Sequence, residues 1–143
     1  MTSARRASVV GFLVLLGLVL AITLSPTPVD QGRGAWVAAV LSVLHRIGVS
    51  ESFGYSELET VSNIVMFIPL GVVLALALPP ARRWIGFVVL PLLSAVIECA
   101  QFVVLPRRYS SFGDVVANSI GGWIGVSLVI VIAEFVAEGR QGQ

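Results

Sequence analysis

The sequence predicts an all-α membrane protein, a four-transmembrane-helix bundle with a short interfacial or re-entrant helix between spans 1 and 2. The 143-residue chain is 57% hydrophobic and only 12% charged, whereas about a quarter of the residues of a soluble domain are charged. Mean hydropathy is +0.96. A chain of this length holds about four apolar runs of roughly 20 residues, separated by short polar turns, with no room for a separate soluble domain.

Four apolar runs in residues 1–143 form the spans of a single predicted membrane domain. The first follows Arg5 and Arg6, as the apolar region of a signal peptide would, but it is longer than the roughly 7–15 residues of such a region. We therefore expect a retained span and not a cleaved signal. Pro69 and Pro91 lie inside the second and third runs and predict kinks. The spans are expected at about residues 9–24, 61–78, 84–105 and 115–136.

Residues 35–49, between the first two spans, form a shorter amphipathic segment. Val37, Val40 and Leu44 share one face at helical spacing, and the segment is too short to cross a bilayer. We therefore expect a helix that lies in the interface or re-enters the membrane. His45, the only histidine, has no second ligand-type residue at metal spacing. We expect it to be solvated, and we expect no metal and no cofactor.

Several functional classes find no support in the sequence. The net charge of +1 does not indicate the basic surface that nucleic-acid binding requires. The single cysteine excludes an internal disulfide. Ser110 and Ser111 lack a nearby histidine, and Gly121-Gly122 lies inside a span, so neither a nucleophile elbow nor a phosphate loop is present. The distribution of arginines between the two sides favours a multi-pass protein of the cell membrane with both termini in the cytoplasm.

Polar side chains gather at the ends of three spans that meet on the side opposite the termini. Glu98 and Gln101 share a face of the third span, Asp114 and Asn118 share a face of the fourth, and Asn63 enters the second. Glu98 lies roughly 10 Å before the end of its span, where an inserted carboxylate costs about 2.5–3.5 kcal/mol. We expect these side chains to form one outward-facing layer in which Glu98 and Asp114 are the catalytic candidates.

The turn after the third span carries two adjacent arginines, Arg107 and Arg108. Their guanidinium groups match phosphate and carboxylate groups in a bidentate manner, so they are candidate substrate ligands together with the three amides. Structural interpretations stay open for each residue. Asp114 fits a capping box with Ser111, the amides fit interhelical hydrogen bonds, and the arginines fit side chains that reach up to headgroups.

The order of these motifs resembles the VanZ-like family of small bacterial membrane proteins. The resemblance covers about residues 59–132 and rests on three segments of the sequence: N-I-V-M-F-I-P-L-G (63–71), E-C-A-Q (98–101) and R-R-Y-S-S-F-G-D-V-V-A-N-S-I-G-G (107–122). The family is named for a member associated with low-level resistance to the glycopeptide teicoplanin. The resemblance implies that the recurring polar positions of the family correspond here to Asn63, Glu98, Gln101, Arg107 or Arg108, Asp114 and Asn118.

Three functions compete on the sequence alone, and whether the protein is an enzyme stays open. The first is an envelope protein that binds or processes an anionic lipid-linked or cell-wall-precursor substrate at the outer leaflet. The second is a non-enzymatic binding or interaction subunit. The third, a proton-coupled transporter, is disfavoured because only Glu98 lies well inside a span. Expected partners are membrane lipids or a lipid-linked precursor, with Gly121 and Gly125 as a candidate oligomer face.

Overall fold

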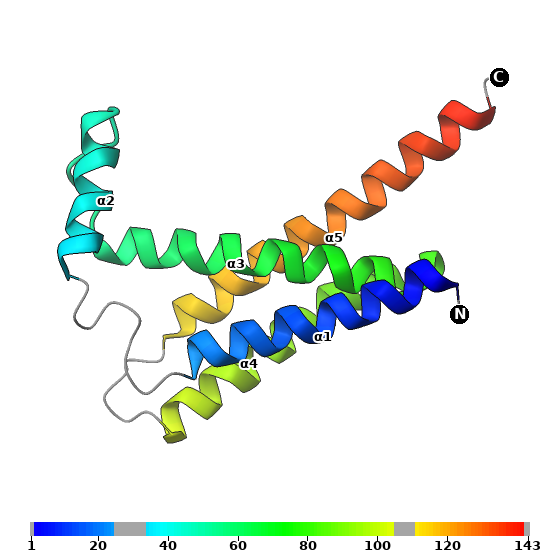
Figure 1. The fold of residues 1–143 in the computed structure, drawn as a ribbon, viewed down its shortest axis with the longest axis horizontal. Helices are drawn as coiled ribbons and strands as arrows, with labels where there is room; N and C mark the ends of the chain where they lie inside the picture. The colour runs from blue at the N-terminus through cyan, green and yellow to red at the C-terminus, as the bar shows by residue number, and fades with distance from the viewer. Residues whose placement is uncertain (1, 25–33, 105–110, 142–143) are drawn as a thin grey trace.

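The computed structural model describes residues 2–24, 34–104 and 111–141, and the regular structure of these residues is entirely helical (Figure 1). Four of the helical segments are long and apolar enough to cross a membrane, and a shorter apolar helix lies between the first two. The predicted fold class is therefore confirmed. The elements are α1 (Ser3–Thr23), α2 (Gly34–Arg46), α3 (Tyr55–Ala77), η1 (Pro80–Ile85), α4 (Gly86–Val104) and α5 (Phe112–Gln141).

Three of the four long helices, α1, α3 and α5, begin before the apolar runs that identified them. α1 begins at Ser3 because Thr2 caps it, its hydroxyl accepting a hydrogen bond from the Arg5 amide at 3.4 Å. α3 begins at Tyr55, where the Glu57 carboxylate accepts a hydrogen bond from the Gly54 amide at 2.8 Å. Hydropathy marks the part of a helix that suits a bilayer, whereas capping groups decide where the helix starts.

The reversal between the second and third spans contains a short 3₁₀ helix, η1. The chain reverses at Pro79–Arg83, where the Arg82 amide donates to the Pro79 carbonyl at 2.8 Å. The turn then continues through η1 directly into α4. Pro69 and Pro91 lie inside α3 and α4, which continue past them.

The most extensive helix packing is between α3 and α5, which cross at the centre of the molecule (Figure 1). Glycines permit their close approach. A Cβ atom on Gly121 would collide with the Ile64 carbonyl oxygen, and one on Gly125 with the Ile68 carbonyl oxygen. The sequence offered the Gly121/Gly125 face for close helix packing and as an oligomer contact. In this structure α3 of the same chain covers that face.

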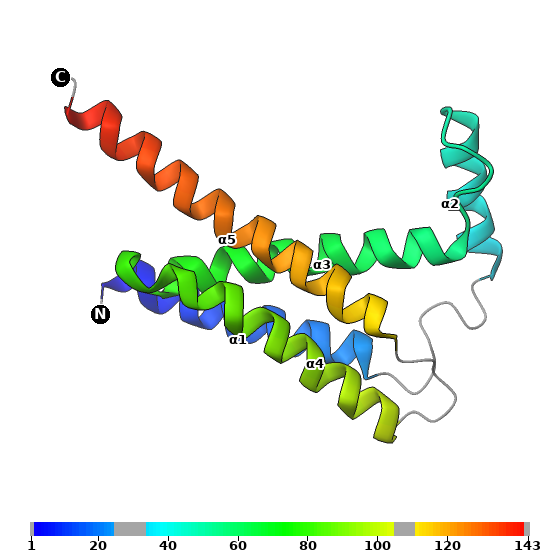
Figure 2. The same cartoon turned by 180° about the vertical axis from the view of Figure 1, so that it is seen from behind.

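The other two long helices complete the bundle on either side of this crossing. α1 packs mainly against α3, and Arg5 Nε donates to the Ala77 carbonyl at 2.6 Å. α4 packs against α5, and a Cβ atom on Gly86 would lie 2.7 Å from a methyl group of Val126. Seen from behind in Figure 2, the N-terminus, the α3–α4 turn and the C-terminal part of α5 lie toward one end.

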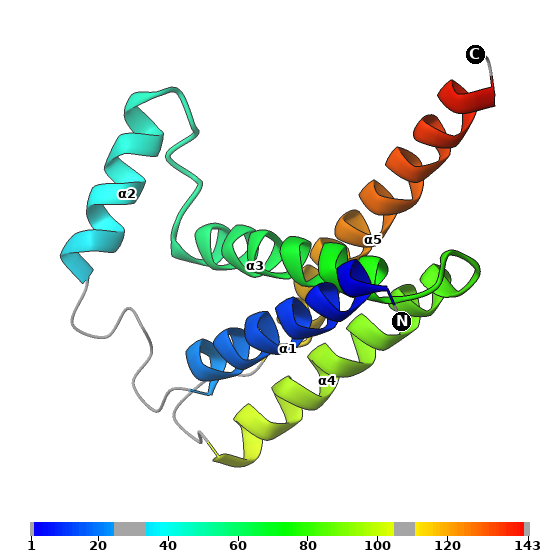
Figure 3. The ribbon, with the colours of Figure 1, turned by 45° about the vertical axis from the view of Figure 1, so that its right-hand side comes forward.

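α2 stands apart from the bundle and runs across the direction of α3 (Figures 1 and 3). It has no buried residue, and Trp36 and Val43 on it are well exposed. His45 Nε2 lies 2.9 Å from the Phe53 carbonyl and holds the connection to α3. This orientation across a span is the one expected of an interfacial helix.

Candidate functional site

Glu98 of α4 is the carboxylate around which the candidate site forms. It lies two turns before the end of α4 and is 8% exposed. Its Oε2 atom accepts a hydrogen bond from the Ser111 amide at 3.2 Å. Because Ser111 directly precedes α5, this bond brings an anionic group to the positive end of a helix dipole. The cost of placing a carboxylate at this depth is thereby reduced.

An open groove runs along the surface between α4 and α5 beside Glu98. Its volume is about 490 Å³, within the range of roughly 300–1,000 Å³ that holds small-molecule ligands. Glu98 is the only acidic side chain among the residues that line this groove, and Cys99, which is exposed, lies next to it. The remaining lining is mainly apolar. The groove is lined by Ala95, Glu98, Cys99, Phe102, Val103, Ser111, Phe112 and Val115.

Asn63 and Asp114 form the second polar contact at this end of the bundle. Asn63 Nδ2 donates to Asp114 Oδ1 at 2.8 Å and so joins α3 to α5. Ser111 caps α5, its hydroxyl accepting from the Gly113 amide at 3.0 Å. Asp114 lies in the first turn of α5, but the Ser111 amide, which a capping box would pair with Asp114, donates to Glu98. The catalytic role of Asp114 stays a prediction.

Gln101, one turn after Glu98, joins two helices. Its Nε2 atom donates to the Thr23 carbonyl at 2.8 Å, which lies at the C-terminal end of α1. Unpaired carbonyls at a helix end need such donors. Gln101 is buried and is not among the residues that line the groove beside Glu98. Its position supports the arrangement of α1 and α4 and gives it no direct path to a ligand in that groove.

Asn118 lies deeper, between α4 and α5. Its Nδ2 atom donates to Ser94 Oγ at 2.9 Å, and both side chains are buried. Asn118 Oδ1 has no hydrogen-bond partner in the described part of the chain. Ser94 precedes Glu98 by four residues and therefore lies on the same face of α4. Asn118 is thus one helical turn below Glu98 on the shared α4–α5 contact, and its amide ties the two helices together.

The structure brings together only some of the predicted site residues. Glu98 meets the first turn of α5, and Asp114 meets Asn63, whereas Gln101 and Asn118 are occupied in separate contacts between helices. Arg107 and Arg108 lie outside the described residues. Sequence reasoning missed Ser94, Thr23 and the backbone amide of Ser111 as partners. The spacing of Ser94 from Glu98 could have revealed the first of these, but the sequence carries no signal for the two backbone partners.

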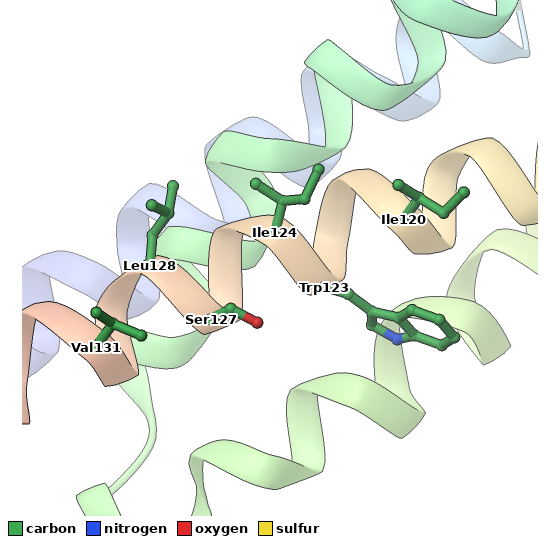
Figure 4. Close-up of a pocket in the computed structure, with 6 residues that line it drawn as sticks. All are labelled: Ile120, Trp123, Ile124, Ser127, Leu128 and Val131. Atoms are coloured by element: carbon green, nitrogen blue, oxygen red, sulfur yellow. The ribbon is translucent and has the colours of Figure 1, made fainter.

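A second groove on the outer face of α5 offers no such chemistry (Figure 4). It has a volume of about 390 Å³, and Ser127 is its one hydroxyl-bearing residue. The Trp123 indole nitrogen donates to the Phe87 carbonyl at 2.9 Å and so holds that ring against α4. Within the described ranges, no group of three His, Cys, Asp or Glu residues could hold a metal ion. The groove beside Glu98 is therefore the better candidate for a site.

The comparison with protein families agrees with the order of motifs along the chain. The model of the VanZ/LLP1 family matches residues 12–133, from within α1 to the last third of α5. The chain belongs to the VanZ/LLP1 family. The match spans all four membrane helices and therefore includes Glu98 and its groove. No curated protein and no solved structure matches this chain.

Proposed function

We propose that this VanZ-like protein binds, and through Glu98 processes, a lipid-linked amphiphile at the outer leaflet of the bacterial cell membrane. The observation that carries the proposal is the position of Glu98. It is a largely buried carboxylate that lines an otherwise apolar groove between two membrane helices. An ionisable residue within a membrane span is a functional hypothesis by default. An amphiphile would place its apolar chain along Phe102 and Val103 and its polar group beside Glu98.

The polar group is proposed to be anionic, with Arg107 and Arg108 as its ligands. Glu98 cannot hold an anion while it is itself ionised, so a cationic partner is needed. The two arginines lie in the sequence between the end of α4 and the start of α5, the two helices that line the groove. Their guanidinium groups suit a phosphate or a carboxylate. Glu98 would then exchange a proton with a hydroxyl or amine of the same substrate.

The remaining residues are proposed to position Glu98. Its bond from the Ser111 amide at 3.2 Å orients the carboxylate, and the Asn63–Asp114 contact holds α5 at the same level. Asp114, in the first turn of α5, would assist Glu98 in proton transfer. Lipid-linked cell-wall precursors have the required chemistry, since they combine a long apolar chain with phosphate groups. This substrate class would also account for a link to teicoplanin susceptibility.

A strain that lacks the gene tests the proposal. It is complemented with the wild type, with Glu98→Gln or with the double variant Arg107→Ala/Arg108→Ala, and its lipid-linked precursors and teicoplanin susceptibility are measured. Glu98→Gln keeps an oxygen that can accept from Ser111 but loses the charge. An enzyme predicts that Glu98→Gln abolishes turnover and retains binding. Unchanged lipids and unchanged susceptibility in all strains would overturn the proposal.

A non-enzymatic binding subunit is the alternative function. The contacts of Gln101 and Asn118 are the observation that supports it. Two of the predicted polar residues are engaged in joining helices, which leaves fewer groups for chemistry than the sequence offered. This alternative predicts that Glu98→Gln has a mild effect, whereas the double arginine variant loses function. The same set of strains separates the two functions.

A further inference from the structure

Four arginines gather at the end of the bundle opposite Glu98. Arg5 and Arg6 lie in the first turn of α1, and Arg82 and Arg83 lie in η1. The views in Figures 1, 2 and 3 agree that the start of α1 lies beside the turn between α3 and α4. We refer to these four residues as the basic end cluster.

One hydrogen bond holds the two halves of this cluster together. Arg5 Nε donates to the Ala77 carbonyl at 2.6 Å in a partly buried position. Ala77 is the last residue of α3, and η1 begins three residues later at Pro80. The bond therefore fixes the arginine pair of α1 next to the pair in η1. Only one of the five N–H groups of Arg5 is used for this purpose.

Among the residues that the structure describes, no carboxylate balances the positive charge of the cluster. No carboxylate of the described residues forms an ion pair with any of its members, and Arg83 Nε is buried without a hydrogen-bond partner within the same part of the chain. Glu57, Glu98 and Asp114 belong to the other end of the bundle. Glu134 and Glu138 belong to the C-terminal part of α5, which extends away from the other helices (Figure 1).

We infer that the basic end cluster binds the phosphate group of an anionic phospholipid in the leaflet that it faces. Arg6 and Arg82 are exposed, whereas Arg5 and Arg83 are partly buried. The bond from Arg5 to Ala77 holds the two pairs of arginines next to each other. The fork of each guanidinium matches two phosphate oxygens, and arginines beside a span reach the headgroup level of a bilayer. A soluble phosphate ester shares this chemistry, but the apolar surfaces of α1 and α4 next to the cluster favour a ligand with acyl chains.

Native mass spectrometry of the purified full-length protein in detergent tests this inference. Phosphatidylglycerol, phosphatidylcholine or glycerol phosphate is added as the probe. The variant is Arg6→Gln/Arg82→Gln, because both side chains are exposed and neither forms a hydrogen bond within the described part of the chain. The matched control is Arg46→Gln/Arg140→Gln, which removes the same charge from α2 and from the far end of α5.

Wild type and control should bind phosphatidylglycerol in preference to phosphatidylcholine. The variant should bind it about 25-fold more weakly, at about fivefold for each arginine removed near an anionic headgroup. Competition by glycerol phosphate at equal concentration would overturn the assignment to a phospholipid, because it would show that acyl chains add nothing to binding. Equal binding of phosphatidylglycerol by variant and control, or no preference for it over phosphatidylcholine, would overturn the inference.

Discussion

Glu98 lies at a depth where an unpaired carboxylate costs about 2.5–3.5 kcal/mol, and although it is largely buried it also lines a groove on the bundle surface. The Ser111 amide and the dipole of α5 lower this cost without removing the side chain from the groove surface. A purely structural role would be served equally well by glutamine, which also accepts a hydrogen bond. Replacing Glu98 with glutamine therefore distinguishes a chemical role of this side chain from a structural one.

The Asn118–Ser94 contact predicts a measurable coupling between two buried side chains. Asn118→Ala, Ser94→Ala and the double variant form a cycle in which the hydrogen bond at 2.9 Å should contribute about 0.6–1.7 kcal/mol, the range found for polar contacts between membrane helices. Unfolding of the purified protein in bicelles measures the four stabilities. Strictly additive losses would mean that the two side chains do not interact.

Two substitutions of Asp114 separate the contribution of its charge to stability from that of its hydrogen bond. Asp114→Asn keeps a carbonyl oxygen that can accept from Asn63 Nδ2, whereas Asp114→Ala removes the acceptor and leaves the Asn63 amide unpaired. We expect Asp114→Ala to lower stability by about 1–3 kcal/mol and Asp114→Asn to lower it by less. Comparison of the two unfolding transitions checks this. A larger loss for Asp114→Asn would show that the carboxylate charge itself holds the helices.

At the scale of the helices, the crossing of α3 and α5 is limited by backbone and not by side chains. Gly121→Ala should destabilise the fold by about 1–3 kcal/mol, because the new methyl group would meet the rigid Ile64 carbonyl. Gly17→Ala is the matched control, since Gly17 has open space around it, and it should be neutral or stabilising by up to about 1 kcal/mol. Thermal unfolding in detergent compares the variants, and equal melting temperatures would contradict the close crossing.

The sequence predicted which segments form helices, but it did not predict which helices and side chains contact one another. Apolar runs and polar turns predicted four spans and the short helix between the first two, because hydropathy and length constrain both. They did not reveal that Gly121 faces Ile64 of the same chain, since a small-residue face suits any helix. Gln101 shows the same limit at the site. Its side chain could be predicted to need a partner, but a backbone carbonyl such as that of Thr23 carries no sequence signal.

At the scale of the whole molecule, the two ends of the bundle differ in charge and in shape. The end with Glu98 also carries α2, whereas the opposite end carries both termini and the basic end cluster. Such an arrangement favours the cytoplasm for the basic end. α5 is 30 residues long, about ten more than a span needs, so we expect its last turns to extend beyond the bilayer on the side of the termini.

Cysteine labelling of intact spheroplasts tests this orientation. In a Cys99→Ser background, Ser52→Cys in the α2–α3 connection should react with a membrane-impermeant maleimide from outside. Gly139→Cys near the end of α5 should react only after the membrane is permeabilised. The reverse pattern would place the groove of Glu98 at the inner leaflet and would contradict an outer-leaflet substrate.

The central claim is that the groove between α4 and α5 holds a lipid-linked amphiphile, and the lipids that co-purify with the protein test it most directly. Ala95→Trp fills this groove, and Ser127→Trp fills the groove on the outer face of α5 as a control. Mass spectrometry of extracted lipids should find a lipid-linked phosphate enriched with the wild type and with Ser127→Trp, and depleted at least about tenfold with Ala95→Trp. Equal amounts of this lipid in all three preparations would contradict the account.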